Sequence, residues 1–396
     1  MKIGIAKPDF GFVGGYERVI ERIAGELHRA GHAITWIKVD AIDVPELPFG
    51  VPLPRHVAPE LWEFQRYAAL TEIFAGLDTS DFDLMISTQP PSFAIRHERH
   101  LAVFSHHQRI YYDLEDVHIG AGFADAELHH RIATAVRRLD QPSLERVSFF
   151  LAASEEVAGR IERFNGLSEN VGVYHAGVAF REDEPADRPA ARAAGWYAIS
   201  VARHEFPKRS ELFIQALKHL PETRGVLVGD GTRLPWLRAL DARLTAAPDP
   251  DAFSVEELWL NTAPVERIEY ASLDSNVEFV VDAASDDLHD LYAGAGCAVA
   301  PAYLEDYGLT AVEAMTYGLP LIVCSDGGGL PWFVEDGVTG FIVEPTGRAI
   351  ADAIARLRRE PELAVEMGRA AREGSRRFTW ERAMEEIHRG VASVTA

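Results

Sequence analysis

Two carboxylates, Glu305 and Glu313, lie eight residues apart in the segment PAYLEDYGLTAVEAMTYG. A short apolar run of strand length ends directly before this segment, and a helix is predicted to begin near Gly308. Glu305 is then expected at the carboxyl end of a strand, where open α/β sheets bind ligands. The free N–H groups of a helix start, here residues 307–310, favour a phosphate group.

Glu313 is predicted to lie beside the buried face of this helix. Leu309, Val312 and Thr316 form the expected inward stripe, and Glu313 lies about 40° from Leu309 around the helix axis. An unpaired buried carboxylate is costly, so Glu313 requires donors, for which ligand hydroxyls and a nearby cation are both candidates. By position alone, a helix cap at Glu305 and a structural arginine beside Glu313 explain the pattern equally well.

Lysine is scarce in this chain, and its full set is Lys2, Lys7, Lys38, Lys208 and Lys218. Lys208, in FPKRS, is expected at a strand-to-helix turn. A fixed cation at such a turn can neutralise a phosphate group without a metal ion. The alternative is a solvated surface lysine beside Arg209.

A second polar cluster follows the apolar run at residues 101–104, in the sequence SHHQRIYYD. It contains His106, His107, Arg109 and Tyr111. A lone histidine at a strand end is usually structural, but the arginine and the aromatic neighbours favour a ligand-binding role here.

Gly14 and Gly15 follow the first apolar run and precede a helical pattern. Glycine lets the backbone approach a phosphate closely and adopt unusual φ angles. This pair by itself is explained as well by an ordinary turn.

The elements that must position these residues alternate between strands and helices. Helical spacing occurs at residues 15–30, 59–76, 125–147, 209–220 and 349–390. Apolar runs of strand length occur at residues 3–6, 33–39, 84–87, 101–104, 149–153, 198–201, 225–228, 277–281, 297–300, 319–323 and 340–343. Such runs are typical of strands covered on both faces, so the chain is predicted to be an α/β protein with two doubly wound parallel sheets.

The predicted domains are residues 1–180 and 196–376. A linker is predicted at residues 181–195, where REDEPADRPAARAAG lacks apolar periodicity. Residues 377–396 are expected to form a helix that packs back towards the N-terminal domain. Residues 245–270 are predicted to form an excursion with its own helix.

Composition excludes several classes of protein. The 396 residues include 61 acidic and 39 basic ones, and the net charge of −22 argues against nucleic-acid binding. Apolar runs are far shorter than the roughly 20 residues of a membrane span, and the first ten residues lack a secretory apolar region. Cys297 and Cys324 are expected to be buried thiols, and a cytoplasmic location is predicted. Neither zinc-ligand spacing nor an Asp-x-Asp motif beside a donor strand occurs, so no metal site is predicted.

The segment EDYGLTAVEAMTYGLPLIVCSDGGG resembles the nucleotide-sugar signature of family 4 of the retaining glycosyltransferases, enzymes of GT-B fold. Further segments resemble the family's motifs in the same order: GGYERVIERIAGELHRAGH, LAASEEVAGRI, YAISVARHEFPKRSELFIQAL, VGDGTRLPWLRAL, FVVDAASDDLHDLYAGAGCAVAP and EDGVTGFIVEP. The resemblance covers almost the whole chain. It implies two Rossmann-like domains facing a central cleft, with an N-terminal acceptor domain and a C-terminal donor domain.

The resemblance also implies roles for individual residues. Arg203 and Lys208 would clamp the donor diphosphate, and Glu313 would bind the ribose hydroxyls. His106 would lie near the donor sugar and act in catalysis with Glu305, Arg203 and Lys208. The remaining donor-binding positions would be Gly14, Gly15, Gly229, Tyr307, Gly308 and Leu309, and the acceptor contacts His107, Arg109 and Tyr111.

Three places depart from the family pattern, and one of them is the strand end FVVDAA at residues 279–284, which lacks the family's usual glycine. Lys208 is followed by Arg209, where the family commonly has glycine, which leaves Arg209 as a substitute phosphate ligand. Trp332 stands in GGGLPWFVEDG where the family usually has glutamate, so a packing or acceptor-facing role replaces a polar one.

The implied reaction is transfer of a sugar from a UDP-, GDP- or dTDP-sugar to the hydroxyl of a saccharide or natural-product intermediate, with retention and without a metal cofactor. The protein would act on small molecules, as a monomer or a homodimer. A sugar phosphorylase and a nonenzymatic nucleotide-sugar-binding protein are the alternatives on the same fold. An NAD-dependent dehydrogenase is disfavoured because the first turn is GFVGG, not G-x-G-x-x-G.

Overall fold

A computed structural model describes residues 1–11, 14–44, 59–179, 195–246, 249–259, 274–281 and 283–395. The chain divides into two compact units. Unit 1 comprises Met1–Gly177 together with Trp380–Ala396, and unit 2 comprises Val178–Thr379. The linker predicted at residues 181–195 lies, except for Gly195, outside the described residues.

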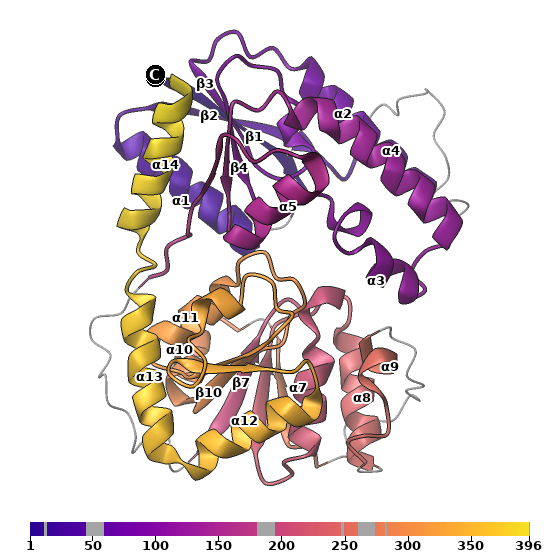
Figure 1. Cartoon of the computed structure of the whole chain (residues 1–396), viewed down its shortest axis with the longest axis vertical. Coiled ribbons are helices and arrows are strands. Elements are labelled where there is room, and N and C mark those ends of the chain that lie inside the picture. Colours follow the sequence, from indigo (N-terminus) through magenta and orange to yellow (C-terminus); the bar gives the residue numbers. More distant parts are fainter. Residues whose placement is uncertain are drawn as a thin grey trace. The chain divides into compact units, whose positions relative to one another are not determined.

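Unit 1 is built on a parallel sheet that has six strands among the described residues, in the order β2-β1-β3-β4-β5-β6. Its elements are β1 (Lys2–Asp9), α1 (Gly15–Arg29), β2 (Ala33–Asp40), α2 (Pro59–Gly76), β3 (Leu84–Ser87), η1 (Ser92–Ala94), β4 (His100–Phe104), η2 (Arg109–Tyr111), α3 (Glu115–Gly120), α4 (Ala126–Leu144), β5 (Phe149–Ala152), α5 (Glu155–Asn165), β6 (Val171–Val173) and α14 (Trp380–Thr395). Figure 1 shows α1 and α14 on one side of this sheet and α2 and α4 on the other.

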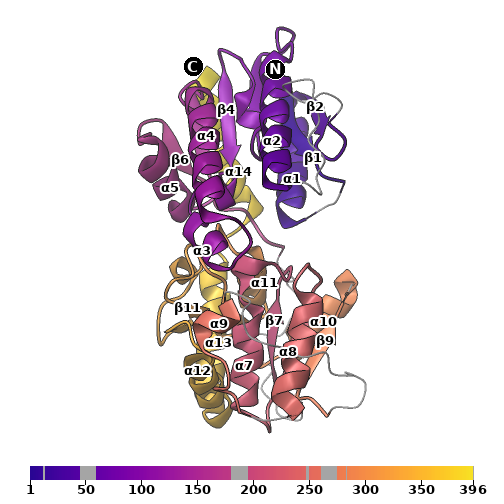
Figure 2. The same cartoon turned by 90° about the vertical axis from the view of Figure 1, so that its right-hand side faces the viewer.

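Unit 2 repeats this architecture with the strand order β12-β11-β10-β7-β8-β9, again six parallel strands within the described ranges. Its elements are β7 (Tyr197–Val201), η3 (Phe206–Lys208), α7 (Ser210–Lys218), β8 (Arg224–Val228), α8 (Leu234–Ala246), α9 (Val255–Trp259), β9 (Val277–Val280), α10 (Ser285–Gly294), β10 (Cys297–Ala300), α11 (Leu309–Thr316), β11 (Leu321–Cys324), η5 (Pro331–Phe333), β12 (Gly340–Val343), α12 (Gly347–Arg359) and α13 (Pro361–Ser375). Figure 2 gives a second view of both units.

The cores explain why the apolar runs form strands. In unit 2 one continuous cluster joins Leu212 of α7, Leu237 of α8 and Ile354 of α12 to Leu227 and Ile322 of the sheet. In unit 1 the corresponding strands β3, β4 and β5 are buried almost throughout. Burial of this apolar surface is the main favourable contribution to folding of each unit.

Most of the predicted strands and helices are present, but the structure differs in several places, which include the helices α3 and α5 that were not predicted. The short strand β6 was missed because its sequence, VGV, is bounded by polar residues and is only half-buried. The helical tail is interrupted, since α12, α13 and α14 are separate helices. Within the predicted excursion, α9 is the described helix, and residues 247–248 and 260–270 lie outside the described residues.

The inward stripe predicted for residues 309–316 was partly wrong. Val312 and Thr316 are buried as expected, but Leu309 is only half-buried, and Ala311, Ala314 and Met315 complete the buried face. The reason is that α11 packs between a strand and a second helix, α13, so that a wider arc of its surface is covered.

No helix in the described residues is both long enough and apolar enough to cross a lipid bilayer.

Candidate functional site

The strand order of unit 2 reverses between β7 and β10. Strands β8 and β9 follow on one side of β7, whereas β10, β11 and β12 lie on the other. Open α/β sheets bind ligands outside the carboxyl ends of the strands at such a switch point. The residues that follow β7 and β10 are therefore the first candidates for a ligand site.

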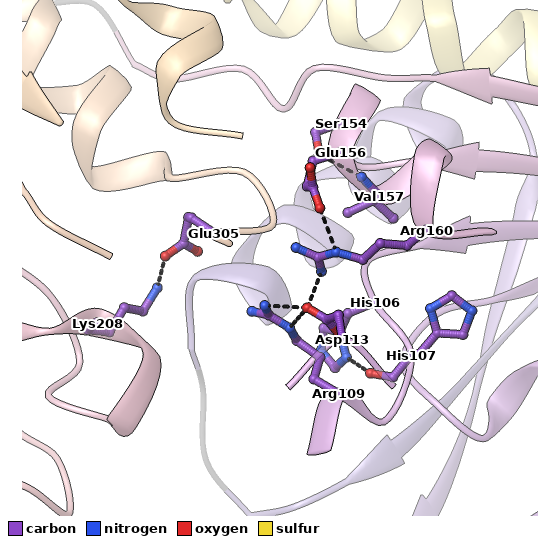
Figure 3. Close-up of polar contacts among 10 residues, drawn as sticks. All are labelled: His106, His107, Arg109, Asp113, Ser154, Glu156, Val157, Arg160, Lys208 and Glu305. Atoms are coloured by element: carbon purple, nitrogen blue, oxygen red, sulfur yellow. Dashed lines mark hydrogen bonds and ion pairs between the residues drawn. The ribbon is translucent and has the colours of Figure 1, made fainter. Parts of the chain in front are cut away.

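Lys208 and Glu305 meet at this switch point. Lys208 ends η3, just after β7, and Glu305 follows β10. The Lys208 ammonium group donates to Glu305 Oε2 in an ion pair (Figure 3). The side chains are 30% and 14% exposed, so the pair is within reach of a ligand.

The backbone around Glu305 is also fixed. The Glu305 N–H donates to the Gly327 carbonyl at 3.1 Å, and the Glu305 carbonyl accepts from the Gly329 N–H at 2.8 Å. A Cβ at Gly328 would lie 2.6–2.7 Å from the backbone at Leu304 and Glu305, so the Gly-rich loop must stay free of side chains here. The carboxylate is thus presented by a rigid backbone.

Gly308 begins α11 in a left-handed conformation, with φ +101° and ψ 52°. A side chain at this position would be strained, and its Cβ would lie 2.5 Å from Leu330 Cδ2. Leu309 is the first residue of the helix, and the buried Tyr307 ring packs edge-on against Phe333 at 5.2 Å. The predicted residues Tyr307, Gly308 and Leu309 therefore form a constrained helix start beside Glu305.

Glu313 lies one turn further along α11 and is half-buried. Burial, and to a smaller extent the Glu313 charge, raises the pKa of the Tyr292 hydroxyl well above its ordinary value. The predicted proximity of a carboxylate to the core is therefore observed.

Arg203 and Gly229 occupy the loops that follow β7 and β8. Arg203 is exposed. Gly229 has φ +128°, and a Cβ there would lie 2.0 Å from the Ala202 carbonyl oxygen. A Cβ added at Gly231 would lie 2.4 Å from the His204 carbonyl oxygen. These glycines allow the two loops to pack backbone against backbone, which fixes the position of Arg203.

Arg209 is a structural residue and not a free phosphate ligand. Its side chain is 1% exposed, its Nη1 donates to Asp326 Oδ2 at 2.9 Å, and its Nε donates to the Pro301 carbonyl at 2.8 Å. The guanidinium also lies 4.5 Å from the Trp259 ring centroid. The suggestion that it substitutes for a diphosphate ligand was therefore wrong, because its donors hold the loop after β10.

Unit 1 has its own switch point, between β1 and β3. Gly14 caps α1 and Gly15 is the first residue of that helix. The Gly14 N–H donates to Glu17 Oε2 at 2.9 Å, and the other Glu17 oxygen accepts from Gln89 Nε2 at 2.9 Å. Glu17 therefore ties the loop after β1 to the loop after β3.

His106 and His107, which follow β4, lie in different surroundings. The half-buried His106 places Nδ1 2.6 Å from the His107 carbonyl oxygen. Because a carbonyl only accepts, Nδ1 carries the proton, and Nε2 of the neutral ring is left to accept a hydrogen bond from a ligand. Figure 3 shows this contact.

The His107 ring is enclosed in unit 1. It is 1% exposed, stacks on Tyr112 at 4.2 Å, and its Nε2 lies 2.7 Å from Asn165 Oδ1. Burial lowers the pKa of His107 to about 4, so the ring is neutral. The predicted acceptor role of His107 does not fit this position, and Tyr111, 3% exposed, is enclosed in the same way. Both side chains contribute to packing instead.

Arg109 belongs to a buried charge network. Arg109 Nε donates to Asp113 Oδ2 at 3.0 Å, and Arg160 Nη1 lies 3.4 Å from the same carboxylate oxygen. Arg160 Nε also donates to Glu156 Oε1 at 3.0 Å (Figure 3). Arg109 is 14% exposed, so its outer surface is still open to a ligand.

Sequence reasoning missed Asp140, which lies behind this loop. The carboxylate is fully buried and accepts hydrogen bonds from the hydroxyls of Tyr67, at 3.0 Å, and Tyr112, at 2.8 Å. Tyr112 in turn stacks on His107. A signal was available, since Asp140 interrupts the apolar face of α4 in the sequence, but its partners come from distant segments.

Trp332 packs within unit 2. Its ring lies 5.6 Å from that of Phe378, and the Arg377 guanidinium lies 4.6 Å from its centroid. Of the two roles left open for this residue, packing is therefore observed, although 39% of its surface is exposed.

The comparisons with known proteins agree with this picture. Residues 262–374, less than a third of the chain, match the family model described as "Glycosyl transferases group 1". A D-inositol 3-phosphate glycosyltransferase of Mycobacterium avium is 32% identical over 223 residues, which are 53% of this chain and 46% of the relative. The corresponding protein of Saccharomonospora viridis is 29% identical over 229 residues. The chain spans about half the length of the curated relatives that it matches.

Solved structures are similar over nearly the whole chain. Anabaena Alr3699/HepE in complex with UDP and glucose has a TM-score of 0.65 at 18% identity, with 99% of this chain and 100% of that chain covered. Sucrose-phosphate synthase from Thermosynechococcus elongatus has a TM-score of 0.70 at 19% identity, with 99% of each chain covered. At these identities the likeness concerns the fold, and the chain has the GT-B fold with one Rossmann-like unit for each sheet.

Proposed function

We propose that the protein is a retaining, metal-independent glycosyltransferase of family 4 that transfers a sugar from a nucleoside diphosphate sugar to a hydroxyl of a saccharide or natural-product intermediate. The observation that carries this proposal is the Lys208–Glu305 pair at the switch point of unit 2, directly before the helix that bears Glu313. A cation, a carboxylate and a helix start at one strand edge match the groups of a nucleotide sugar.

Each group has a defined part in the proposed reaction. Lys208 and Arg203 stabilise the negative charge that develops on the leaving diphosphate, and the helix start at Leu309 adds N–H dipoles. Glu313 accepts hydrogen bonds from the ribose, and Glu305 accepts them from the donor sugar or stabilises positive charge at the anomeric carbon. His106 Nε2 accepts a hydrogen bond from a substrate hydroxyl.

The bond changes follow from these assignments. The bond between the anomeric carbon and the diphosphate oxygen breaks, and the acceptor oxygen bonds to the same face of that carbon. The departing phosphate oxygen takes the acceptor proton, so no separate base is required. Positioning and fixed charges then supply most of the barrier reduction. The reaction is proposed to take place in the cytoplasm.

A donor screen tests the proposal. The full chain is heated with UDP-, GDP- and dTDP-sugars, and a donor that binds the native state raises Tm by an amount that increases with the ratio of its concentration to its Kd. UDP-glucose is the first choice, because Anabaena HepE has been crystallised with UDP and glucose and with UDP-glucose. We expect one nucleotide class to raise Tm in the wild type and to have little effect on Glu313→Ala.

Product analysis then separates the alternatives. Release of nucleoside diphosphate that depends on an acceptor supports the transferase, and the anomeric configuration of the product is read by NMR. Sugar release that requires inorganic phosphate would instead indicate a phosphorylase. If no donor raises Tm, or if Glu313→Ala responds like the wild type, the proposed donor site is wrong.

A further inference from the structure

A groove of about 450 Å³ lies on unit 1 between α1 and the edge strand β2. Its volume falls within the range of about 300–1,000 Å³ that is usual for small-molecule sites. Its strand side is formed by Lys7, Ile34, Trp36 and Lys38, and its helix side by Glu21, Ala24, Gly25 and His28. Nothing in the proposed transferase reaction uses these residues.

The two lysines of the groove are direct neighbours across the sheet. Lys7 of β1 is in register with Lys38 of β2, and both side chains line the groove. Like charges directly opposite each other on two strands destabilise a sheet. In the described part of the chain neither ammonium group has a carboxylate within ion-pair distance, and Lys38 lies 5.9 Å from the Trp36 ring centroid. Two of the five lysines of a chain with net charge −22 therefore line one groove, where a bound anion would reduce their repulsion.

Gly25 is a second residue of this groove that is unfavourable for local stability. It lies inside α1, where glycine destabilises a helix relative to alanine. Packing within the described residues does not require it, because an added Cβ would meet only the end of the flexible Arg29 side chain, at 3.9 Å. With no side chain at Gly25 and only a methyl group at Ala24, the part of the groove that these residues line together with Trp36 forms a slot.

We propose that this groove binds a small phosphorylated sugar. The two ammonium groups of Lys7 and Lys38 hold the phosphate dianion, and the sugar ring lies in the slot between Trp36 and Gly25. Glu21 accepts hydrogen bonds from ring hydroxyls. His28 completes the site, since its Nδ1 lies 3.3 Å from the His32 carbonyl, which leaves Nε2 to accept from the ligand. Locally unfavourable residues in native proteins occur mainly where function requires them. Here two such features, the neighbouring lysines and the glycine inside α1, line one groove.

The experiment is isothermal titration calorimetry of the full chain with glucose 6-phosphate, and with glucose and inorganic phosphate as the two half-ligands. We expect glucose 6-phosphate to bind more tightly than either half, because the groove contacts both parts. The double variant Lys7→Ala/Lys38→Ala should weaken this binding by about tenfold or more, since charge-assisted hydrogen bonds are lost. Lys208→Ala should leave it unchanged, which separates the groove from the proposed donor site.

Gly25→Ala is expected to change stability and ligand binding in opposite directions. The alanine should raise Tm without ligand, because it favours the helix, and should weaken glucose 6-phosphate binding, because its methyl group fills the slot. Gly159 of α5 is the matched control. It also lies inside a helix, and a Cβ added there would have nothing within 4 Å. Gly159→Ala should raise Tm and leave binding intact.

Three results would overturn the proposal. The first is equal binding of glucose 6-phosphate and inorganic phosphate, which would exclude the ring slot. The second is retention of binding in the double lysine variant with its loss in Lys208→Ala, which would place the sugar phosphate in unit 2. The third is tighter binding of UMP than of glucose 6-phosphate through the same lysines, which would assign the slot to a base.

Discussion

The carboxyl edges of the two sheets use charged residues in opposite ways. In unit 2 the Lys208–Glu305 pair is accessible, with side chains 30% and 14% exposed. In unit 1 Asp113 and Arg160 are each 1% exposed and hold the loop after β4. An exposed pair can exchange its partner for a ligand at little cost, whereas a buried pair cannot be broken without leaving a charge unsolvated. The same architecture therefore provides accessible charges in one unit and a buried charge network that holds the loop after β4 in the other.

The largest effect is expected from Asp113→Ala. Removal of this carboxylate breaks an ion pair in which both side chains are 1% exposed, so unfolding should become easier by about 3–5 kcal/mol. Urea denaturation of the full chain measures the loss. Glu26→Ala, which breaks exposed pairs with Arg22 and Arg29, should cost under about 1 kcal/mol. Equal losses in the two variants would remove the contrast between buried and accessible charges.

Lys208→Ala should have the next largest effect, on turnover and not on folding. Loss of a fixed donor to developing negative charge lowers kcat by about 100- to 1,000-fold. Release of nucleoside diphosphate from the donor that raises Tm is the measurement. The exposed Lys2→Ala is the control, and a Lys208→Ala enzyme as active as this control would show that the unit 2 pair has no role in the reaction.

Asp140→Asn tests, through the pH dependence of stability, how a buried carboxylate of unit 1 behaves. Burial raises the pKa of Asp140 to about 7, above that of an exposed aspartate, although the Tyr67 and Tyr112 hydroxyls act against it. The native state thus keeps a proton that the unfolded chain releases, so the stability contributed by this group is present below about pH 4 and is lost as pH rises through 7. Asparagine does not titrate.

The free energy of unfolding of Asp140→Asn, relative to the wild type, should therefore increase with pH over this window. The expected slope reaches at most about 1.4 kcal/mol per pH unit. Denaturation at pH 5 and pH 8 measures it. Parallel pH profiles for the two proteins would show that Asp140 stays ionised in the native state.

The smallest effect is expected from His106→Ala. One hydrogen bond to a substrate hydroxyl contributes about 1 kcal/mol, so kcat/KM should fall by about tenfold or less. His388→Ala, on the exposed side of α14, is the control. A separate readout is nitrogen NMR of His106, where protonated Nδ1 is expected; protonation at Nε2 instead would contradict the contact with the His107 carbonyl.

Much of the fold could be predicted because it depends on local patterns. The apolar runs 84–87, 297–300 and 340–343 coincide with β3, β10 and β12, since strands buried on both faces need continuous apolar sequence. The proposed site was less accessible to prediction. Glu305, Lys208 and Gly308 were selected as candidates because they follow strands. The burial of His107 and Tyr111 was not foreseen, because a position after a strand does not determine whether the side chain faces solvent or is covered by other segments.

The sequence alone determined the alternation of strands and helices, the excess of acidic residues and the candidate residues at the strand ends, because these follow from composition and spacing. Only the tertiary structure decided which charges are accessible. Arg209 and Lys208 are adjacent in the sequence, yet one is 1% exposed and bonded to Asp326, and the other is 30% exposed beside Glu305. The difference arises because partners distant along the chain, not neighbours, set the solvation of a charge.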